Sequence, residues 1–203
     1  MIAIIDYDIG NISAVANMLQ RLGLRSQITS RADEVAAAER IILPGNGSFD
    51  ACMRNLRASG LIPVLERKVL EQGTPLLGIC VGAQMLGTAS EEGSEAGLGW
   101  LDMRVRRFPQ LPGLRVPHMG WNLVRRVAPT HRLTREMDSD ARFYFVHSYY
   151  METSDPEDVL LLTTYGIDFA AGVSRGNVSG VQFHPEKSHR FGKQLLAAFA
   201  GSE

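Results

Sequence analysis

"PLLGICVGAQML" occupies residues 75–86 and combines three local signals in twelve positions. An apolar run ends in Cys80, Gly78 and Gly82 flank the cysteine, and a helical pattern follows. A short buried strand, a tight turn and a helix are the repeating unit of α/β folds. The stretch therefore predicts a strand-turn-helix unit in which Cys80 is either a small core residue or a thiol held out to react.

The chain around this stretch alternates in the same way. Short apolar runs and amphipathic segments follow one another up to about residue 90, which predicts a parallel sheet covered on both faces by helices. After residue 100 nearly every segment is strand-like, until a last helix at 188–200. We expect a single α/β domain, residues 1–203, with a mostly parallel central sheet flanked by helices and additional antiparallel strands in the second half. The first half is expected to have strands at 2–6, 25–29, 40–44 and 75–79 and helices at 11–22, 32–39, 49–60 and 61–73.

Composition excludes several classes of protein. The net charge of −1 gives no indication of binding to nucleic acid or to a membrane surface. The two cysteines, Cys52 and Cys80, form no CxxC pair, which excludes a disulfide scaffold and a zinc ribbon and suits a reducing compartment. The N-terminus has no signal-peptide pattern, and no apolar run approaches the roughly 20 residues that a membrane span needs. We expect a cytoplasmic protein with no membrane segment.

The G-x-C-x-G pattern at 78–82 is the thiol counterpart of the nucleophile elbow G-x-S-x-G. A tight strand-to-helix turn leaves no room for side chains beside the nucleophile. The following helix directs its N-terminus at the sulfur, which favours the thiolate, and the N–H of Val81 would face a developing oxyanion. Taken alone, the pattern fits catalysis and a glycine-flanked core cysteine equally well. Cys52, in contrast, lies in a helical stretch without such a pattern and is predicted to be structural.

Two further loops follow predicted strands. "HPEKS" begins with His184, Pro185 and Glu186, and in an extended segment the imidazole and the carboxylate would project on one side. A cysteine, a histidine and an orienting carboxylate are the parts of a nucleophile triad. "PGNGSF" has Gly45, Asn46 and Gly47 after a strand, where free N–H groups could complete an oxyanion hole or form a plain turn.

In this order, "PGNGSF", "GICVGAQ" and "GVQFHPEKS" resemble a class I glutamine amidotransferase domain, whose fold is flavodoxin-like. Within that class, "DYDIGN" near the start, "PHMGWN" at 117–122 and "YFVHSYY" at 144–150 resemble the glutaminase subunits of imidazole glycerol phosphate synthase, and the similarity covers nearly the whole chain.

The resemblance implies a glutaminase that forms a cysteinyl thioester with L-glutamine and needs no metal or cofactor. It further implies that ammonia passes to a cyclase subunit of the (β/α)₈-barrel type, which makes imidazole glycerol phosphate and AICAR in histidine biosynthesis. The implied catalytic residues are Cys80, His184 and Glu186, with Val81, Gly45 and Asn46 forming the oxyanion hole. The implied substrate-binding residues are Gly47, Gln84, Ser148 and Tyr149. The implied partner contacts are Asn11, His118, Met119, Trp121, Tyr144 and Lys187.

Three alternatives remain open at this point. The first is a paralogous glutaminase subunit that feeds another synthase, such as one for an amidino sugar. Asn46 keeps this alternative open, because the family usually has valine at this position. A free-standing cysteine hydrolase of this fold would not need the "PHMGWN" segment as a docking edge. A binding scaffold without activity would not need all three of Cys80, His184 and Glu186.

Overall fold

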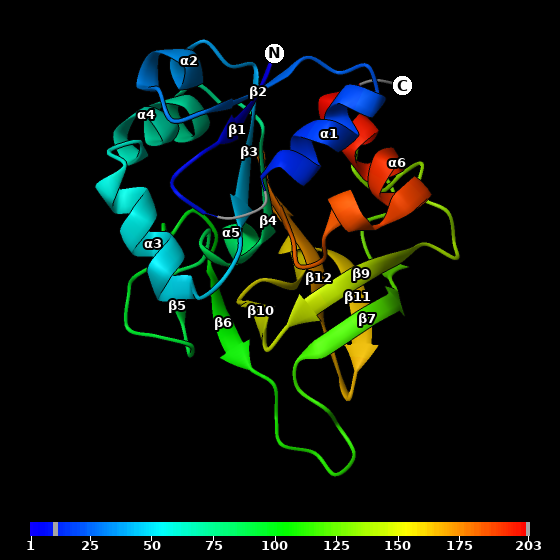
Figure 1. Cartoon of the computed structure of the whole chain (residues 1–203). Coiled ribbons are helices and arrows are strands. Elements are labelled where there is room, and N and C mark those ends of the chain that lie inside the picture. Colours follow the sequence, from blue (N-terminus) through cyan, green and yellow to red (C-terminus); the bar gives the residue numbers. More distant parts are fainter. Residues whose placement is uncertain (10–11, 202–203) are drawn as a thin grey trace.

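The computed structural model describes residues 1–9 and 12–201 (Figure 1). Its main sheet has the strand order β2-β1-β3-β4-β13-β12-β10-β6-β5, in which the first five strands run parallel to one another. These five strands are β1 Ile2–Ile5, β2 Ser26–Thr29, β3 Arg40–Gly45, β4 Leu76–Cys80 and β13 Val178–Val181. Because β3, β4 and β13 are adjacent, the three loops singled out in the sequence leave the same edge of the sheet.

Helices cover both faces of this parallel region, as its apolar strands require. All residues of β1, β4 and β13 are buried. In Figure 1, α1 and α6 lie on one side of the strands and α2, α3 and α4 on the other. The helices are α1 Ser13–Arg21, α2 Ala32–Ala36, α3 Phe49–Ala58, α4 Ile62–Glu66, continued by the π-helical turn η1 Arg67–Glu71, α5 Val81–Gln84 and α6 His189–Ala200.

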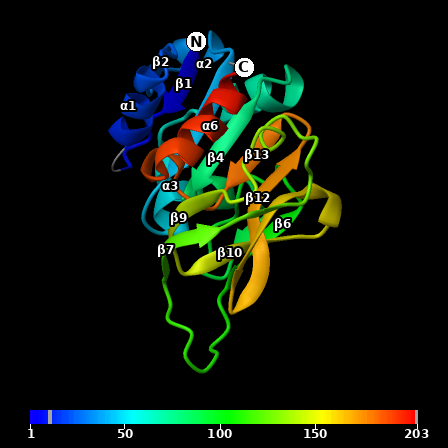
Figure 2. The same cartoon turned by 90° about the vertical axis from the view of Figure 1, so that its right-hand side faces the viewer.

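The second half extends the sheet with antiparallel strands and adds a separate two-stranded sheet, β7–β9. A hydrogen bond from Asn122 Nδ2 to the carbonyl of Thr164 joins β7 to β11 (2.9 Å). Figure 2 shows the segment between β6 and β7 projecting beyond the sheets. The remaining elements are β5 Ala89–Ser90, β6 Met103–Arg107, β7 His118–Leu123, β8 Arg125–Arg126, β9 Arg142–His147, β10 Tyr149–Thr153, η2 Pro156–Asp158, β11 Val159–Tyr165, β12 Ile167–Arg175 and η3 Pro185–Lys187.

The expected fold class is confirmed, and two local differences concern the site. The helix after Cys80 is a single turn, because the chain turns at Gly87 and then forms β5. The strand-like segment 141–152 forms two strands rather than one, because the chain leaves the β7–β9 sheet at Ser148 and joins the main sheet through β10. Asn11 lies outside the described residues. Among residues 1–9 and 12–201, no helix is long and apolar enough to cross a membrane.

Candidate active site

Cys80 is the last residue of β4 and the residue immediately before α5, and its backbone is held in an unusual conformation. Its φ of +55° and ψ of −116° lie in a region that non-glycine residues adopt only at a cost. Such strain is characteristic of functional sites, where surrounding structure maintains it. The side chain is 5% exposed. The elbow expected from the G-x-C-x-G pattern is therefore present.

The glycines around Cys80 allow the elbow to pack directly against the end of β3. A Cβ atom at Gly82 would collide with the carbonyl oxygen of Leu43, and one at Gly45 would collide with the backbone nitrogen of Gly82. A Cβ at Gly78 would lie 2.7 Å from the Cα of Ala83. Backbone therefore touches backbone between the elbow and the loop after β3, which brings Gly47 to the cavity of Cys80.

This packing predicts a large effect of Gly82→Ala. The added methyl group meets backbone that cannot rotate away, so we expect a loss of at least about 2 kcal/mol in the free energy of unfolding and loss of glutaminase activity. Gly23→Ala is the control, because a Cβ atom at Gly23 would meet open space and only the positive φ of this residue would add strain. That variant should lose about 1 kcal/mol and keep its activity. Urea denaturation and glutamate release measure the two effects, and an active, stable Gly82→Ala would contradict the packing argument.

His184 and Glu186 lie together, although not in the way that an extended segment predicts. His184 is extended, but Pro185 begins the 3₁₀ turn η3, which folds Glu186 back beneath the imidazole. The distance from His184 Nδ1 to Glu186 Oε1 is 2.7 Å, and both side chains are buried. Proline suits the first position of such a turn, because its φ is already set and it has no N–H to leave unpaired.

Opposing effects act on the pKa of His184. Burial lowers it, whereas the hydrogen bonds with Cys80 and Glu186 and the charges of these two groups raise it more strongly, to about 9. Glu186 thus holds Nδ1 and stabilises the protonated ring, while Cys80 is the other hydrogen-bonding partner. The three side chains form a line of nucleophile, base and orienting carboxylate.

A cavity of about 300 Å³ opens in front of Cys80. Seven of the predicted site residues line it, together with four residues to which the sequence analysis assigned no role. The predicted ones are Asn46, Gly47, Cys80, Val81, Gln84 and the pair Ser148–Tyr149; the others are Glu92, Pro117, Val146 and His147. Gly45, His184 and Glu186 instead border a small cavity of about 30 Å³ behind the elbow. Cys80 thus borders the larger cavity, and its two partners border the smaller one.

Two glutamine side chains join the segments that form the cavity wall. The amide nitrogen of Gln84 donates to the carbonyl of Tyr149 (3.1 Å) and to Oε1 of Gln182 (3.0 Å). The amide nitrogen of Gln182 lies 4.0 Å from the sulfur of Cys80. Gln182 belongs to the quoted "GVQFHPEKS" segment. Its approach to Cys80, however, depends on β13 lying beside β4. The sequence analysis assigned no role to Glu92. Its carboxylate accepts the N–H of Phe49 (2.8 Å), and this bond holds the acidic loop that contains Glu92 against α3.

A buried histidine pair links β7 to the same wall. Burial lowers the pKa of His118 to about 4 and that of His147 to about 3, so both rings are neutral at pH 7. His147 Nδ1 must carry a proton, because its partner at 2.7 Å is the carbonyl of Tyr149. His147 Nε2 then accepts from His118 Nδ1 (2.9 Å), and His118 Nε2 accepts from Asn122 Nδ2 (3.3 Å). The hydrogen bonds therefore run in one direction from β7 to Tyr149.

The predicted partner contacts differ in their exposure to solvent. His118 is 3% exposed and stacks on Phe145 and Tyr165, so the prediction of a surface contact conflicts with its position on the inward face of β7. Met119 and Trp121 alternate with it and are exposed, as is Leu123; we call these three residues the β7 stripe. Tyr144 and Lys187 lie nearby: Trp121 contacts the Tyr144 ring edge-on, and the Lys187 ammonium lies 5.7 Å from the centre of that ring.

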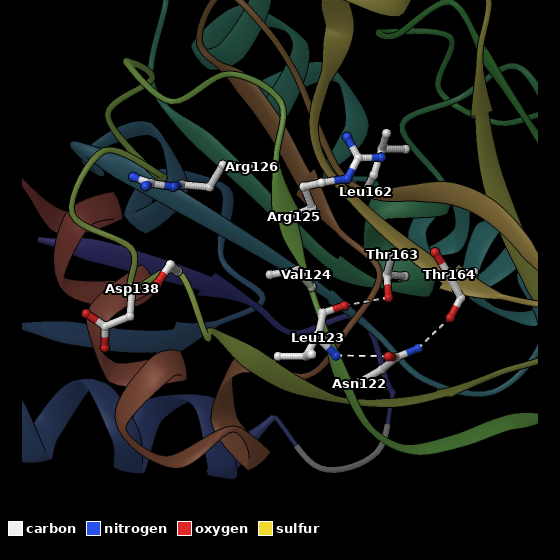
Figure 3. Close-up of a pocket in the computed structure, with 10 residues that line it drawn as sticks. Asn122, Leu123, Val124, Arg125, Arg126, Asp138, Leu162, Thr163 and Thr164 are labelled. Carbon is white, nitrogen blue, oxygen red and sulfur yellow. Dashed lines mark hydrogen bonds between the residues drawn. The ribbon is translucent and has the colours of Figure 1, made fainter.

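A third cavity, of about 600 Å³, lies beside β7, β8 and β11 (Figure 3). Its lining residues include no cysteine or histidine, and several of its polar groups are paired with one another. Thr163 donates to the carbonyl of Leu123 (2.7 Å), and Asn122 donates to that of Thr164 (2.9 Å). The cavity in front of Cys80, although smaller, is the one lined by the cysteine that interacts with His184.

Comparisons with known proteins agree with this geometry. A model of the family "Glutamine amidotransferase class-I" matches residues 3–201. The chain is 50% identical to "Imidazole glycerol phosphate synthase subunit HisH 2" of Pseudomonas aeruginosa, covering 98% of both chains. It is 48% identical to the HisH subunit of Bdellovibrio bacteriovorus, covering 98% of this chain and 99% of that one. The solved structure of PurLQS from Thermotoga maritima has the same fold, with a TM-score of 0.75, 19% identity and coverage of 98% and 97%. The chain therefore belongs to the class I glutamine amidotransferases, in the family of HisH subunits of imidazole glycerol phosphate synthase.

Proposed function

We propose that this chain hydrolyses L-glutamine to glutamate and ammonia through a thioester on Cys80, and that it supplies the ammonia to a cyclase subunit of the (β/α)₈-barrel type. The observation that carries the proposal is the arrangement of Cys80, His184 and Glu186 between two cavities. The larger space can hold an amino-acid amide, and the smaller one is bordered by His184 and Glu186.

In the first half of the reaction, the Cys80 sulfur attacks the carboxamide carbon of glutamine. The Cys80 proton passes to His184, whose pKa of about 9 keeps the ring protonated at neutral pH. The imidazolium then donates this proton to the amide nitrogen as the C–N bond breaks, so ammonia leaves and the thioester remains. Glu186 keeps the ring in the orientation and tautomer that this transfer needs.

In the second half, water attacks the thioester while His184 takes up its proton, and glutamate leaves as the Cys80 sulfur departs. Both halves pass through a tetrahedral oxyanion. Backbone N–H groups of Val81 and of the loop after β3 border the cavity at Cys80 and would stabilise this charge. One such donor is typically worth about 10²–10³ in rate.

The cavity wall offers groups for the rest of the substrate. Glu92 is the acidic side chain among the lining residues, and we propose that it receives the α-ammonium group of glutamine. Gln84, Ser148 and Tyr149 border the same space, and the bond from Gln84 to Tyr149 keeps these two segments together. This set distinguishes an amino-acid substrate from a simple amide.

The β7 stripe supports a partner. Met119 is 62% exposed, Trp121 45% and Leu123 56%, a row of apolar side chains that a free-standing hydrolase would have no reason to expose. Lys187 joins this surface to the triad, since it borders the small cavity with His184 and Glu186. We propose that ammonia leaves on this side and that the cyclase covers the stripe.

The test is glutamate release from glutamine by the chain alone and with a cyclase subunit of the histidine pathway plus its nucleotide ligand. We expect measurable activity alone and a rise in the complex, together with transfer of ammonia to the cyclase product. Glutamate release without any response to this cyclase would favour a different synthase, such as one that makes an amidino sugar. No glutamate release under either condition would contradict the proposal.

A further inference from the structure

The acidic loop that follows β5 is held at both ends by backbone hydrogen bonds. The N–H of Glu91 donates to the carbonyl of Val105 (2.9 Å), and the N–H of Gly97 donates to the carbonyl of Thr88 (3.0 Å). Among the described residues, no backbone–backbone bond reaches residues 92–96, which form neither a helix nor a strand. Side chains must therefore fix this part of the chain, here called the 92–96 loop.

The side chain of Asp50, the second residue of α3, binds the main chain of the 92–96 loop. Its two carboxylate oxygens accept the N–H groups of consecutive residues: Oδ2 accepts that of Ser94 (3.1 Å) and Oδ1 that of Glu95 (3.0 Å). The loop also approaches this carboxylate at Gly93, where a Cβ atom would lie 2.0 Å from Oδ1. Asp50 therefore occupies the space that a side chain at Gly93 would need.

Arg57, further along α3, holds the end of the same loop by weaker contacts. Its guanidinium donates to the carboxylate of Glu95 and to the carbonyl of Ala96. The side chains of Arg57 and Glu95 are 39% and 28% exposed, and ion pairs that are open to water contribute little. The side chain of Asp50 is 20% exposed, and its bonds are made to the main chain, so they determine the path of the loop directly.

Asp50 keeps its negative charge in this position. The N–H groups of Glu95 and Ser94 lower the pKa of its carboxyl below the ordinary value, although burial has the opposite effect. The guanidinium of Arg54 lies 3.8 Å from Oδ2 and also lowers this pKa. An ionised carboxylate accepts hydrogen bonds more strongly than a neutral group does, so both N–H groups are held at pH 7.

These contacts determine where Glu92 lies, because Glu92 directly precedes Gly93. Oε2 of Glu92 accepts the N–H of Phe49 (2.8 Å), the residue before Asp50. The first turn of α3 therefore binds the loop at two adjacent points, and one of them is the Glu92 carboxylate itself. Within residues 1–9 and 12–201, Oε1 of Glu92 has no hydrogen-bond partner, so it is available to a ligand in the cavity that Glu92 borders.

We infer that Asp50 is a positioning residue for substrate recognition: by holding the main chain of the 92–96 loop, it keeps the Glu92 carboxylate in the cavity of Cys80, where the α-ammonium group of glutamine binds. This inference rests on the proposed function. Without Asp50, only the weaker contacts would hold the loop against α3, and Glu92 would leave the cavity for part of the time. Affinity for the ammonium group would fall, whereas the chemistry at the carboxamide would continue.

Asp50→Ala removes both acceptor oxygens, and Asp50→Asn keeps one of them. For Asp50→Ala, we expect KM for glutamine to rise about tenfold and kcat to stay within about twofold, because the lost contact is to the ammonium group and not to the reacting carboxamide. Asp50→Asn should lie between this variant and the wild type. Asp33→Ala is the matched control and should keep its KM. Asp33 also stands in the first turn of a helix and pairs with an arginine, but α2 contributes nothing to the lining of the cavity.

Two reagents that alkylate Cys80 separate a loss of ammonium binding from general distortion of the cavity. 6-Diazo-5-oxo-L-norleucine has the α-ammonium and α-carboxylate groups of glutamine, whereas iodoacetamide has neither. In Asp50→Ala, the second-order rate constant for the first reagent should fall about tenfold, and that for iodoacetamide should keep its wild-type value. Mass spectrometry of the Cys80 peptide measures both. Glu92→Gln should give the same pattern, because it removes the charge that Asp50 holds in place.

Gly93→Ala tests the contact from the side of the loop. Its methyl group would displace the Asp50 carboxylate, so this variant should raise KM by a similar factor. In Asp50→Ala that space is vacant, and the further change Gly93→Ala should cause no additional rise in KM. Such non-additivity is the result expected when two residues act through one contact.

An unchanged KM in Asp50→Ala would overturn the inference. Equal losses with the two alkylating reagents would also overturn it, because the cavity as a whole would then be distorted, and so would additive effects of Asp50→Ala and Gly93→Ala. If Asp50→Ala does not fold, Asp50→Asn and Gly93→Ala take its place in the same assays. Failure of the proposed function is a separate result, since the wild-type chain itself would then release no glutamate, alone or with the cyclase.

Discussion

Cys80→Ala is expected to abolish glutamine hydrolysis while leaving the ammonia-dependent reaction of the complex intact. Removal of the nucleophile from a triad of this kind costs on the order of 10⁶ in kcat, since no other group near the carboxamide can form the covalent intermediate. Cys52, the second cysteine of the chain, cannot substitute, because its thiol faces the interior and is bound to Asn46. The loss should therefore be complete within the limits of an assay of glutamate release.

The complex with the cyclase provides the internal control for this variant. Ammonium salts supplied in place of glutamine should support product formation at the wild-type rate, which shows that the variant folds and binds its partner. Glutamate release that survives Cys80→Ala would refute the thioester mechanism. Loss of both activities together would indicate a folding defect, and a thermal melt of the isolated variant distinguishes that case.

Glu186→Gln is expected to reduce kcat strongly and to change its pH dependence. A glutamine side chain still accepts the hydrogen bond from His184 Nδ1 through its oxygen, but it carries no charge. A comparable change in a serine protease triad lowers kcat by about 10⁴-fold. Glu157→Gln, on the exposed turn η2, removes one carboxylate away from the site and should leave kcat unchanged.

The pH profile follows from the raised pKa of His184. In the wild type, the acid that protonates the leaving nitrogen is lost only above pH 9, because the hydrogen bonds and charges of Cys80 and Glu186 outweigh burial and hold the pKa of His184 at about 9. Without the Glu186 charge this pKa falls, so the alkaline limb of kcat should move to lower pH. Measurement of kcat between pH 6 and 10 tests this, and an unmoved alkaline limb would show that Glu186 does not control the proton on His184.

The same shift has a defined sign for stability. The pKa of His184 is higher in the folded chain than the ordinary value of 6.5, so protonation favours the folded state. The resulting stabilisation is fully present below pH 6.5 and is lost as the pH rises through 9. Glu186→Gln should therefore reduce the difference in thermal stability between pH 6.5 and pH 9.5.

Much of the site could be predicted because its parts are short and local. The G-x-C-x-G pattern predicts a turn in which side chains have no room, and the collisions that a Cβ atom at Gly78 or Gly82 would make give the physical reason. The loop "PGNGSF" and the segment "HPEKS" follow strands of the same sheet, and strands β3, β4 and β13 place them at one edge. Their meeting at one edge therefore follows from a parallel arrangement.

Residues whose roles depend on contacts between distant segments could not be predicted in this way. Glu92 belongs to an acidic loop without any periodic pattern, and it reaches the cavity only because that loop folds onto α3. Cys52 has the pattern of a core residue, and its burial confirms that expectation, but its bond to Asn46 depends on how α3 packs beneath the loop.

The sequence by itself determined the alternation of strands and helices, the elbow at Cys80 and the pairing of His184 with Glu186, since each depends on residues a few positions apart. Only the tertiary structure decided which side chains face which space. His118 and Met119 are neighbours in "PHMGWN", yet one lies in the core and the other in solvent. A strand alternates its faces, and the face that is buried depends on what packs against it: here β11, which is contributed by residues some forty positions later.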